Sequence, residues 1–224
     1  MRRPLTLLAL CAPLVVPPPA PAQASPFAPR AGDRYWGAWF GASFDSPIGT
    51  FWGGTTPGRS LVLVGLRAHY VVETLGPVAI AFTADLIPTA VVNNNPRWRW
   101  SELVGGGEVY EYKEITDSGL VYGAGLSPVG LHVSMPVWGP VRAYGGGAVG
   151  GLWFTHEVPV PYARSFNYTL EVGGGLDVAI GASHVIAIGF KVHHLSNMNA
   201  ASSNPGLDGN VFYLGLLRRR TPMR

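Results

Sequence analysis

Cysteine is almost absent from this sequence of 224 residues. Cys11 is the only one, and it lies in an N-terminal segment that we expect to be removed during export. After that removal the chain has no thiol, which excludes a disulfide, a cysteine-based metal site and a thiolate nucleophile.

Charged side chains and long apolar runs are also scarce. Only 13% of the residues are charged, and Arg2 and Arg3 supply part of the formal net charge of +3. Much of the remaining basic excess lies at 218–220 and Arg224, so the sequence lacks the broad basic face that nucleic-acid binding requires. No stretch of 18 apolar residues occurs, which excludes a membrane-spanning helix.

The first 24 residues have the pattern of a secretory signal peptide. Arg2 and Arg3 precede a mostly apolar stretch from Leu5 to Val16, and Ala22-Gln23-Ala24 is a small-x-small cleavage site. We therefore expect residues 1–24 to be a cleaved signal peptide and residues 25–224 to form a single domain.

Glycine, proline and aromatic residues are abundant, with 30 Gly, 20 Pro and 11% aromatic side chains, and they suit twisted strands better than amphipathic helices. Eight segments show the period-two alternation of strands. These are 34–44, 61–73, 78–91, 119–135, 141–154, 165–180, a segment that starts at 184 and carries His194 and Ser196 at its far end, and 209–217.

The connections between these segments alternate between long and short. The short ones are 74–77, 136–140 and 181–183, and the longer ones are 45–60, 92–118, 155–164 and 196–208. Short periplasmic turns and longer external loops are typical of outer-membrane barrels. The sequence thus predicts an all-β fold, an eight-stranded antiparallel outer-membrane β-barrel with both termini in the periplasm. A hairpin around 108–115 would extend above the membrane.

The alternation also predicts which side chains face lipid and which fill the interior. An eight-stranded barrel is too narrow for an open pore, so polar side chains inside it should pair with one another. The predicted lipid-facing set is Phe166, Leu170, Ile188, Phe190, Phe212 and Leu214. The predicted interior set is Arg67, His69, Glu73, Asp85, Glu171, Asp177 and Lys191. Six tryptophans near predicted strand ends or loops suit an interfacial aromatic girdle, namely Trp36, Trp39, Trp98, Trp100, Trp138 and Trp153.

A candidate catalytic cluster lies near the C-terminal end. Residues two apart on a strand point to the same face, so His194 and Ser196 are neighbours on the face that we predict to meet lipid. A serine needs a base to become a nucleophile, and the base needs a third group to hold its tautomer. Asp208 is the nearby carboxylate, while Asn197 and Asn204 are candidates to orient the loop or to donate to an oxyanion.

These residues resemble the signature of the outer-membrane lipid A deacylases, also labelled acyloxyacyl hydrolases. That signature is His-x-Ser-Asn, then Asn-Pro-Gly, then a carboxylate, and a final strand with a glycine. Here it corresponds to His194-Leu195-Ser196-Asn197, Asn204-Pro205-Gly206, Asp208 and Gly215. The acid of the family is usually Glu, whereas this chain has Asp208.

The resemblance implies an esterase without a cofactor that removes an ester-linked acyl chain from lipid A, or from a related lipid, in the outer leaflet. His194, Ser196 and Asp208 would be its catalytic residues.

Other interpretations remain open for the same residues. A single His-x-Ser is usually an ordinary polar pair at a strand end, and Asn-Pro-Gly is ordinary turn chemistry. The remaining histidines have no ligand spacing that would indicate a metal. The main alternative is a non-enzymatic small barrel with a structural or adhesive role, and the outward apolar pattern disfavours a soluble lipocalin-like binder. A homodimer is also left open.

Overall fold

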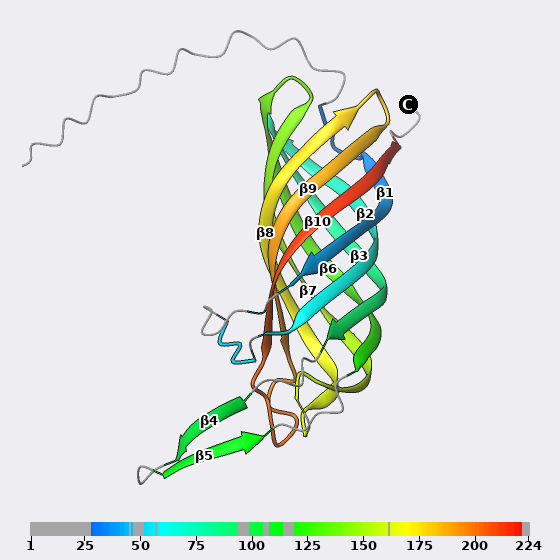
Figure 1. Ribbon diagram of the computed structural model, residues 1–224. Coiled ribbons are helices and arrows are strands. Elements are labelled where there is room, and N and C mark those ends of the chain that lie inside the picture. Colours follow the sequence, from blue (N-terminus) through cyan, green and yellow to red (C-terminus); the bar gives the residue numbers. More distant parts are fainter. Residues whose placement is uncertain are drawn as a thin grey trace, which may run out of the picture.

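The computed structural model describes residues 28–44, 46, 52–56, 58–93, 99–104, 108–113, 119–160 and 162–220. The predicted signal peptide and its cleavage site lie outside these residues. In the described part, ten strands form one closed barrel and one separate hairpin (Figure 1). Their bounds are β1 Arg34–Ser43, β2 Ser60–Leu75, β3 Val78–Asn93, β4 Arg99–Val104, β5 Glu108–Lys113, β6 Leu120–Trp138, β7 Val141–Val158, β8 Arg164–Ile180, β9 His184–Ser196 and β10 Leu207–Arg220.

The barrel is closed by eight antiparallel strands in the order β1, β10, β9, β8, β7, β6, β3, β2. The predicted eight-stranded antiparallel barrel is therefore confirmed. The hairpin of β4 and β5 is inserted between β3 and β6, where the sequence predicted a hairpin, and Figure 1 shows it beyond one end of the barrel. No helix in the described part of the chain is long and apolar enough to cross a membrane.

The two ends of the barrel differ in their connections. Three short turns lie at one end, and each contains a glycine with a positive φ, at Gly76, Gly139 and Gly181. Glycine adopts this left-handed conformation without the clash that a Cβ would cause. The start of β1 and the end of β10 lie at the same end, because Arg34 pairs with Arg220. By the rule that short turns of outer-membrane barrels are periplasmic, we assign this end to the periplasm.

The outer wall carries the apolar side chains that the alternation predicted. Ile188, Phe190, Phe212 and Leu214 are 52%, 37%, 65% and 57% exposed, as a face in contact with lipid requires. The two others of the predicted set, Phe166 and Leu170, are exposed and half-buried.

Polar side chains inside the barrel are paired. Arg67 donates two hydrogen bonds to Asp85, at 2.8 and 2.7 Å. Lys191 Nζ lies 2.6 Å from Glu171 Oε2. His132 and Asp177 form a third pair at 2.9 Å. These contacts neutralise charges that the apolar wall separates from water. They confirm the predicted interior pairing for Arg67, Asp85, Glu171, Asp177 and Lys191. His69 lies inside as predicted but, among the described residues, has no ion-pair partner.

Two predicted positions are wrong. Glu73 is exposed rather than inside the barrel, because a register irregularity between Val71 and Glu73 shifts its parity. Trp39 is 3% exposed and lies inside the barrel, whereas we expected it in the interfacial girdle. The Lys191 ammonium lies 4.0 Å from the centre of the Trp39 ring, so the indole serves as a cation–π partner in the interior.

Of the other predicted girdle residues, Trp36, Trp138 and Trp153 are 54%, 63% and 66% exposed. Trp98 and the side chain of Trp100 lie outside the described part of the structure.

We expect Asp85→Ala to lower the free energy of unfolding by about 3–5 kcal/mol, because it leaves the guanidinium of Arg67 buried without its partner. The measurement is urea unfolding in detergent micelles, followed by the heat-modifiable gel mobility of the barrel. Glu73→Ala is the matched control and should leave the midpoint unchanged. Equal midpoints for Asp85→Ala and the wild type would contradict the paired interior.

Candidate active site

The antiparallel register of β9 and β10 brings the candidate residues together. His194 lies directly opposite Asp208, and the loop between the two strands connects them at the end of the barrel away from the short turns. Asp208 is the second residue of β10 rather than part of the preceding loop, which corrects the predicted start of this strand at 209. Leu195 points into the barrel and is fully buried, so His194 and Ser196 face outward on either side of it.

His194 contacts the carboxylate of Asp208, and the backbone of Gly54 fixes the position of that carboxylate. Its Nδ1 lies 2.5 Å from Asp208 Oδ1, and Asp208 is 1% exposed. The other carboxylate oxygen, Oδ2, accepts a hydrogen bond of 2.9 Å from the backbone N–H of Gly54. A carboxylate accepts, so in the neutral imidazole this contact places the proton on Nδ1 and leaves the lone pair on Nε2. This is the tautomer that a general base needs.

A segment distant in sequence completes this contact. Thr55 donates to the carbonyl of Pro205 from its backbone and from its hydroxyl, at 2.8 and 2.9 Å, and the Thr56 hydroxyl donates to the carbonyl of Gly206 at 2.6 Å. Gly54 is closest to the carboxylate, and a Cβ at this position would lie 2.4 Å from Asp208 Oδ2. The sequence predicts only a long connection at 45–60, and no local pattern indicates the role of Gly54.

Ser196 is held by amide groups of the same loop. Its hydroxyl lies 3.2 Å from Asn204 Oδ1 and 3.1 Å from Asn204 Nδ2. The backbone N–H of Met198 donates to the hydroxyl oxygen of Ser196 at 3.1 Å. Met198 and Asn199 both have positive φ values, and this tight turn directs the N–H of Met198 back to the serine. A backbone donor of this kind gives no signal in the sequence.

Asn197 and Asn204 shape the loop around the serine. Asn197 is 1% exposed, its side chain donates to the carbonyl of Ser203 at 2.8 Å, and its backbone N–H donates to Asn204 Oδ1 at 3.0 Å. Asn204 Nδ2 is the second donor to the serine hydroxyl, beside the N–H of Met198. Two N–H groups therefore donate to the Ser196 hydroxyl oxygen.

All five predicted site residues lie at this end of β9 and β10, but they form two separate hydrogen-bonded groups. One joins His194 to Asp208, and the other joins Ser196 to Asn204 and Asn197. The structure has no hydrogen bond between His194 and Ser196. The Ser196 hydroxyl is directed to Asn204, so a contact between the serine and the imidazole would require the serine side chain to rotate.

The outer wall beside Ser196 is aromatic. Tyr168 of β8 lies directly opposite Ser196 and is 48% exposed. Its ring packs edge-on against Phe166 at 5.1 Å between centroids, and Phe166 lies 6.0 Å from Trp153 of β7. The serine thus opens onto an apolar, lipid-facing surface.

His193 belongs to the interior rather than to this site. It is fully buried, and its Nδ1 lies 3.0 Å from Glu171 Oε1. In the described part of the chain, no group of three His, Cys, Asp or Glu side chains is arranged to hold a metal ion.

Comparison with solved structures finds other small barrels at low identity. The crystal structure of the outer membrane enzyme PagL is 11% identical, with 84% of this chain and 99% of that chain covered and a TM-score of 0.48. Neisserial surface protein A (NspA) is 12% identical, with 84% and 97% covered and a TM-score of 0.48. Ail, the attachment invasion locus protein of Yersinia pestis, is 14% identical, with 85% and 99% covered and a TM-score of 0.44. These likenesses carry no argument about function.

Comparison with protein families is more specific. No curated protein matches this chain. The family model described as "Lipid A 3-O-deacylase (PagL)" matches residues 87–216, which are more than half of the chain and include all five candidate residues. The chain therefore belongs to the lipid A 3-O-deacylase (PagL) family of outer-membrane proteins.

Proposed function

We propose that this protein is an outer-membrane esterase that removes an ester-linked acyl chain from lipid A, or from a related lipid of the outer leaflet. The observation that carries the proposal is the buried contact of His194 with Asp208, beside a serine on the lipid-facing wall. A carboxylate with both oxygens occupied fixes the tautomer of the imidazole, and the outer wall of the barrel is the face that lipid reaches.

In the proposed reaction, the Ser196 hydroxyl leaves its contact with Asn204 and attacks the ester carbonyl. His194 Nε2 accepts the serine proton and returns it to the departing alcohol of the sugar, while Asp208 stabilises the imidazolium. A water molecule then attacks the acyl-serine, with His194 again accepting a proton, and the fatty acid is released. No cofactor takes part in these steps.

The two N–H groups beside the serine have a role in this scheme. The side-chain amide of Asn204 and the backbone N–H of Met198 both donate to the Ser196 hydroxyl, and we expect them to donate to the carbonyl oxygen when it becomes an oxyanion. Asn197 orients the loop, because its backbone N–H holds the oxygen of the Asn204 amide and so presents the nitrogen to the serine. The aromatic surface of Tyr168, Phe166 and Trp153 supports the acyl chain next to the ester.

The proposal is tested by mass spectrometry of lipid A from outer membranes with and without the expressed protein. We expect the lipid A of expressing cells to lose the mass of one hydroxyacyl chain. Folded protein in the outer membrane with unchanged lipid A would contradict the enzyme and favour the non-enzymatic barrel. Heat-modifiable gel mobility establishes that the barrel is folded in the same samples.

Gly54→Ala is expected to lower ester hydrolysis while the barrel still folds. The new Cβ would overlap Asp208 Oδ2, so the carboxylate must move away from the backbone N–H that holds it, and His194 loses its fixed orientation. We expect the loss in kcat, with little change in KM, when hydrolysis of a long-chain ester is measured in micelles. Gly119→Ala is the matched control, since a Cβ there meets open space. Unchanged kcat in Gly54→Ala would contradict the assigned role.

A further inference from the structure

The outer wall at the periplasmic end has a group of arginines without acidic partners among the residues that the structure describes. Arg34 begins β1, and Arg218 and Arg220 lie near the end of β10; all three side chains are exposed on the outside of the barrel. Arg34 lies directly opposite Arg220. Like charges placed opposite each other on neighbouring strands repel, and an anion bound between them would relieve this repulsion.

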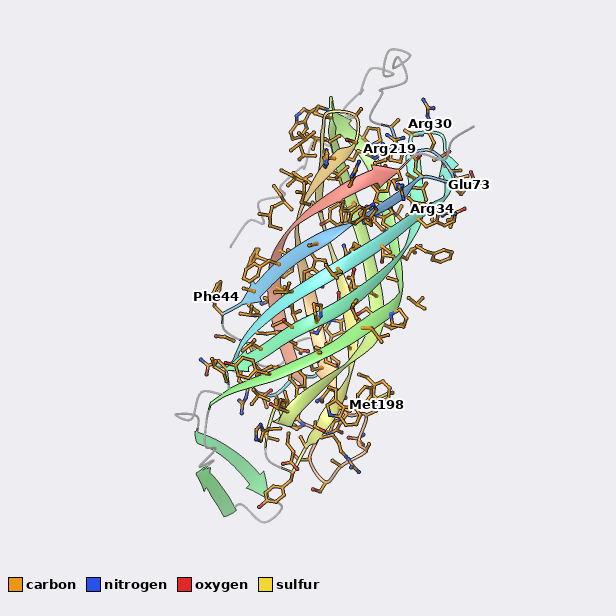
Figure 2. The ribbon with its side chains drawn as sticks, turned by 90° about the vertical axis from the view of Figure 1, so that its right-hand side faces the viewer. Arg30, Arg34, Phe44, Glu73, Met198 and Arg219 are labelled. Carbon is orange, nitrogen blue, oxygen red and sulfur yellow. The ribbon has the colours of Figure 1, made fainter. Side chains whose placement is uncertain are left out.

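The arginine between them shows the contrast. Arg219 points inward, and its guanidinium lies 2.6 Å from Asp33 Oδ2. In the described part of the chain, the three outward arginines make no ion pair. Glu73 lies at the same end, as Figure 2 shows, but its Oε1 accepts from the backbone N–H of Thr74. Among the described residues, no carboxylate neutralises the outward charges, so they are available to an anionic group outside the protein.

A groove in the lipid-facing wall is lined by two of these arginines, Arg34 and Arg220. It has a volume of about 540 Å³, within the range of small-molecule sites, and Arg34 and Arg220 lie at its edge. Its floor is formed where two small residues, Ala68 and Ala84, pair across β2 and β3. Larger outward side chains border this floor, namely Trp36, Tyr70, Phe82 and Pro128. The guanidinium of Arg34 lies over the ring of Tyr70, at 5.8 Å from its centre, which joins the basic edge to the apolar groove.

We propose that this groove binds one glycerophospholipid of the periplasmic leaflet. Its phosphate would lie between Arg34, Arg218 and Arg220, and an acyl chain would lie along Ala68 and Ala84. Guanidinium groups suit phosphate because they donate several hydrogen bonds in one plane. The apolar groove suits the chain, and a phosphate between Arg34 and Arg220 removes their repulsion. This site lies at the opposite end of the barrel from Ser196, so it is independent of the proposed esterase.

The test is native mass spectrometry of the purified full-length protein in micelles, with phosphatidylglycerol as the probe and diacylglycerol of the same chains as the comparison without a phosphate. We expect the wild type to retain one molecule of phosphatidylglycerol. The fraction of protein that retains diacylglycerol should be at least about tenfold smaller. The triple variant Arg34→Gln, Arg218→Gln, Arg220→Gln should lose most of the bound phospholipid. Arg30→Gln is the matched control, since Arg30 is exposed at the same end but precedes the barrel wall, and it should bind as the wild type does (Figure 2).

The groove is tested separately from the charges. Ala84→Leu fills the floor of the groove without changing any charge, so it should also release the phospholipid, whereas Ala124→Leu, at another exposed position of the wall, should not. If the triple variant does not fold, the single changes Arg218→Gln and Arg220→Gln give the same comparison, each with a smaller loss. Equal retention by the arginine variants and the wild type, equal retention of diacylglycerol, or wild-type binding by Ala84→Leu would each overturn the proposal.

Discussion

Replacing Ser196 with alanine is expected to reduce lipid A hydrolysis by at least about 10³-fold while the barrel still folds. The change removes the proposed nucleophile from a half-buried position at the end of β9, where the lost hydroxyl contacts only the loop amides. His194→Ala should have a similar effect, because the serine then has no base. Residues that act as one unit do not contribute additively, so the double variant should be little worse than either single one.

Release of fatty acid from lipid A in detergent micelles measures this loss, with heat-modifiable mobility as the control for folding. Ser202→Ala is the matched variant, because Ser202 is an exposed serine of the same loop whose hydroxyl lies 3.4 Å from the carbonyl of Tyr162. It should retain the activity of the wild type. Full activity in folded Ser196→Ala would remove the serine from the mechanism.

Changing Asp208 is expected to have the second largest effect. Both oxygens of this carboxylate accept hydrogen bonds, one from His194 Nδ1 and one from the backbone of Gly54. Asparagine offers only one acceptor and replaces the other with a donor, so Asp208→Asn either reverses the imidazole tautomer or opposes the N–H of Gly54. We expect kcat to fall by about 10²-fold, which is less than for Ser196→Ala. A loss equal to that of Ser196→Ala, or no loss, would contradict an orienting role.

The length of the acid gives a sharper form of this prediction. Lipid A deacylases usually carry Glu at this position, but here the carboxylate is 1% exposed and is closed in by Gly54 and His194. An additional methylene group has no space without displacing one of these contacts. Asp208→Glu is therefore expected to lower kcat, and an increase would show that the shorter acid is a defect of this chain.

The arrangement of the strands was predictable because alternation is a local signal. The pattern of Ile188, Phe190 and Lys191 assigned two of these side chains to lipid and one to the interior, and the exposed fractions confirm it. The prediction of an interfacial girdle was wrong for Trp39. Trp39 lies three residues after Trp36, so alternation alone places the two side chains on opposite faces of the strand. The interior admits the indole because the neighbouring Gly65 has no side chain, and a Cβ there would lie 2.3 Å from the ring.

The candidate site was only partly predictable. His194, Ser196 and Asp208 lie within fifteen residues of one another, so their proximity follows from a hairpin between two adjacent strands. The contact of Gly54 with Asp208 spans 154 positions, and no local pattern indicates it. Likewise, the hydrogen bonds between Asn204 and the serine hydroxyl depend on the path of the loop between β9 and β10. Sequence periodicity does not determine such a path.

The most direct test of the central claim is covalent labelling of the nucleophile. Incubation with a long-chain alkyl fluorophosphonate transfers the phosphonyl group to an activated serine with loss of fluoride, and peptide mass spectrometry locates the adduct. We predict one adduct per chain, on Ser196, that forms much more slowly in His194→Ala and is absent in Ser196→Ala. Lipid A hydrolysis that continues at the wild-type rate after labelling, or an adduct on another residue that abolishes it, would contradict the mechanism.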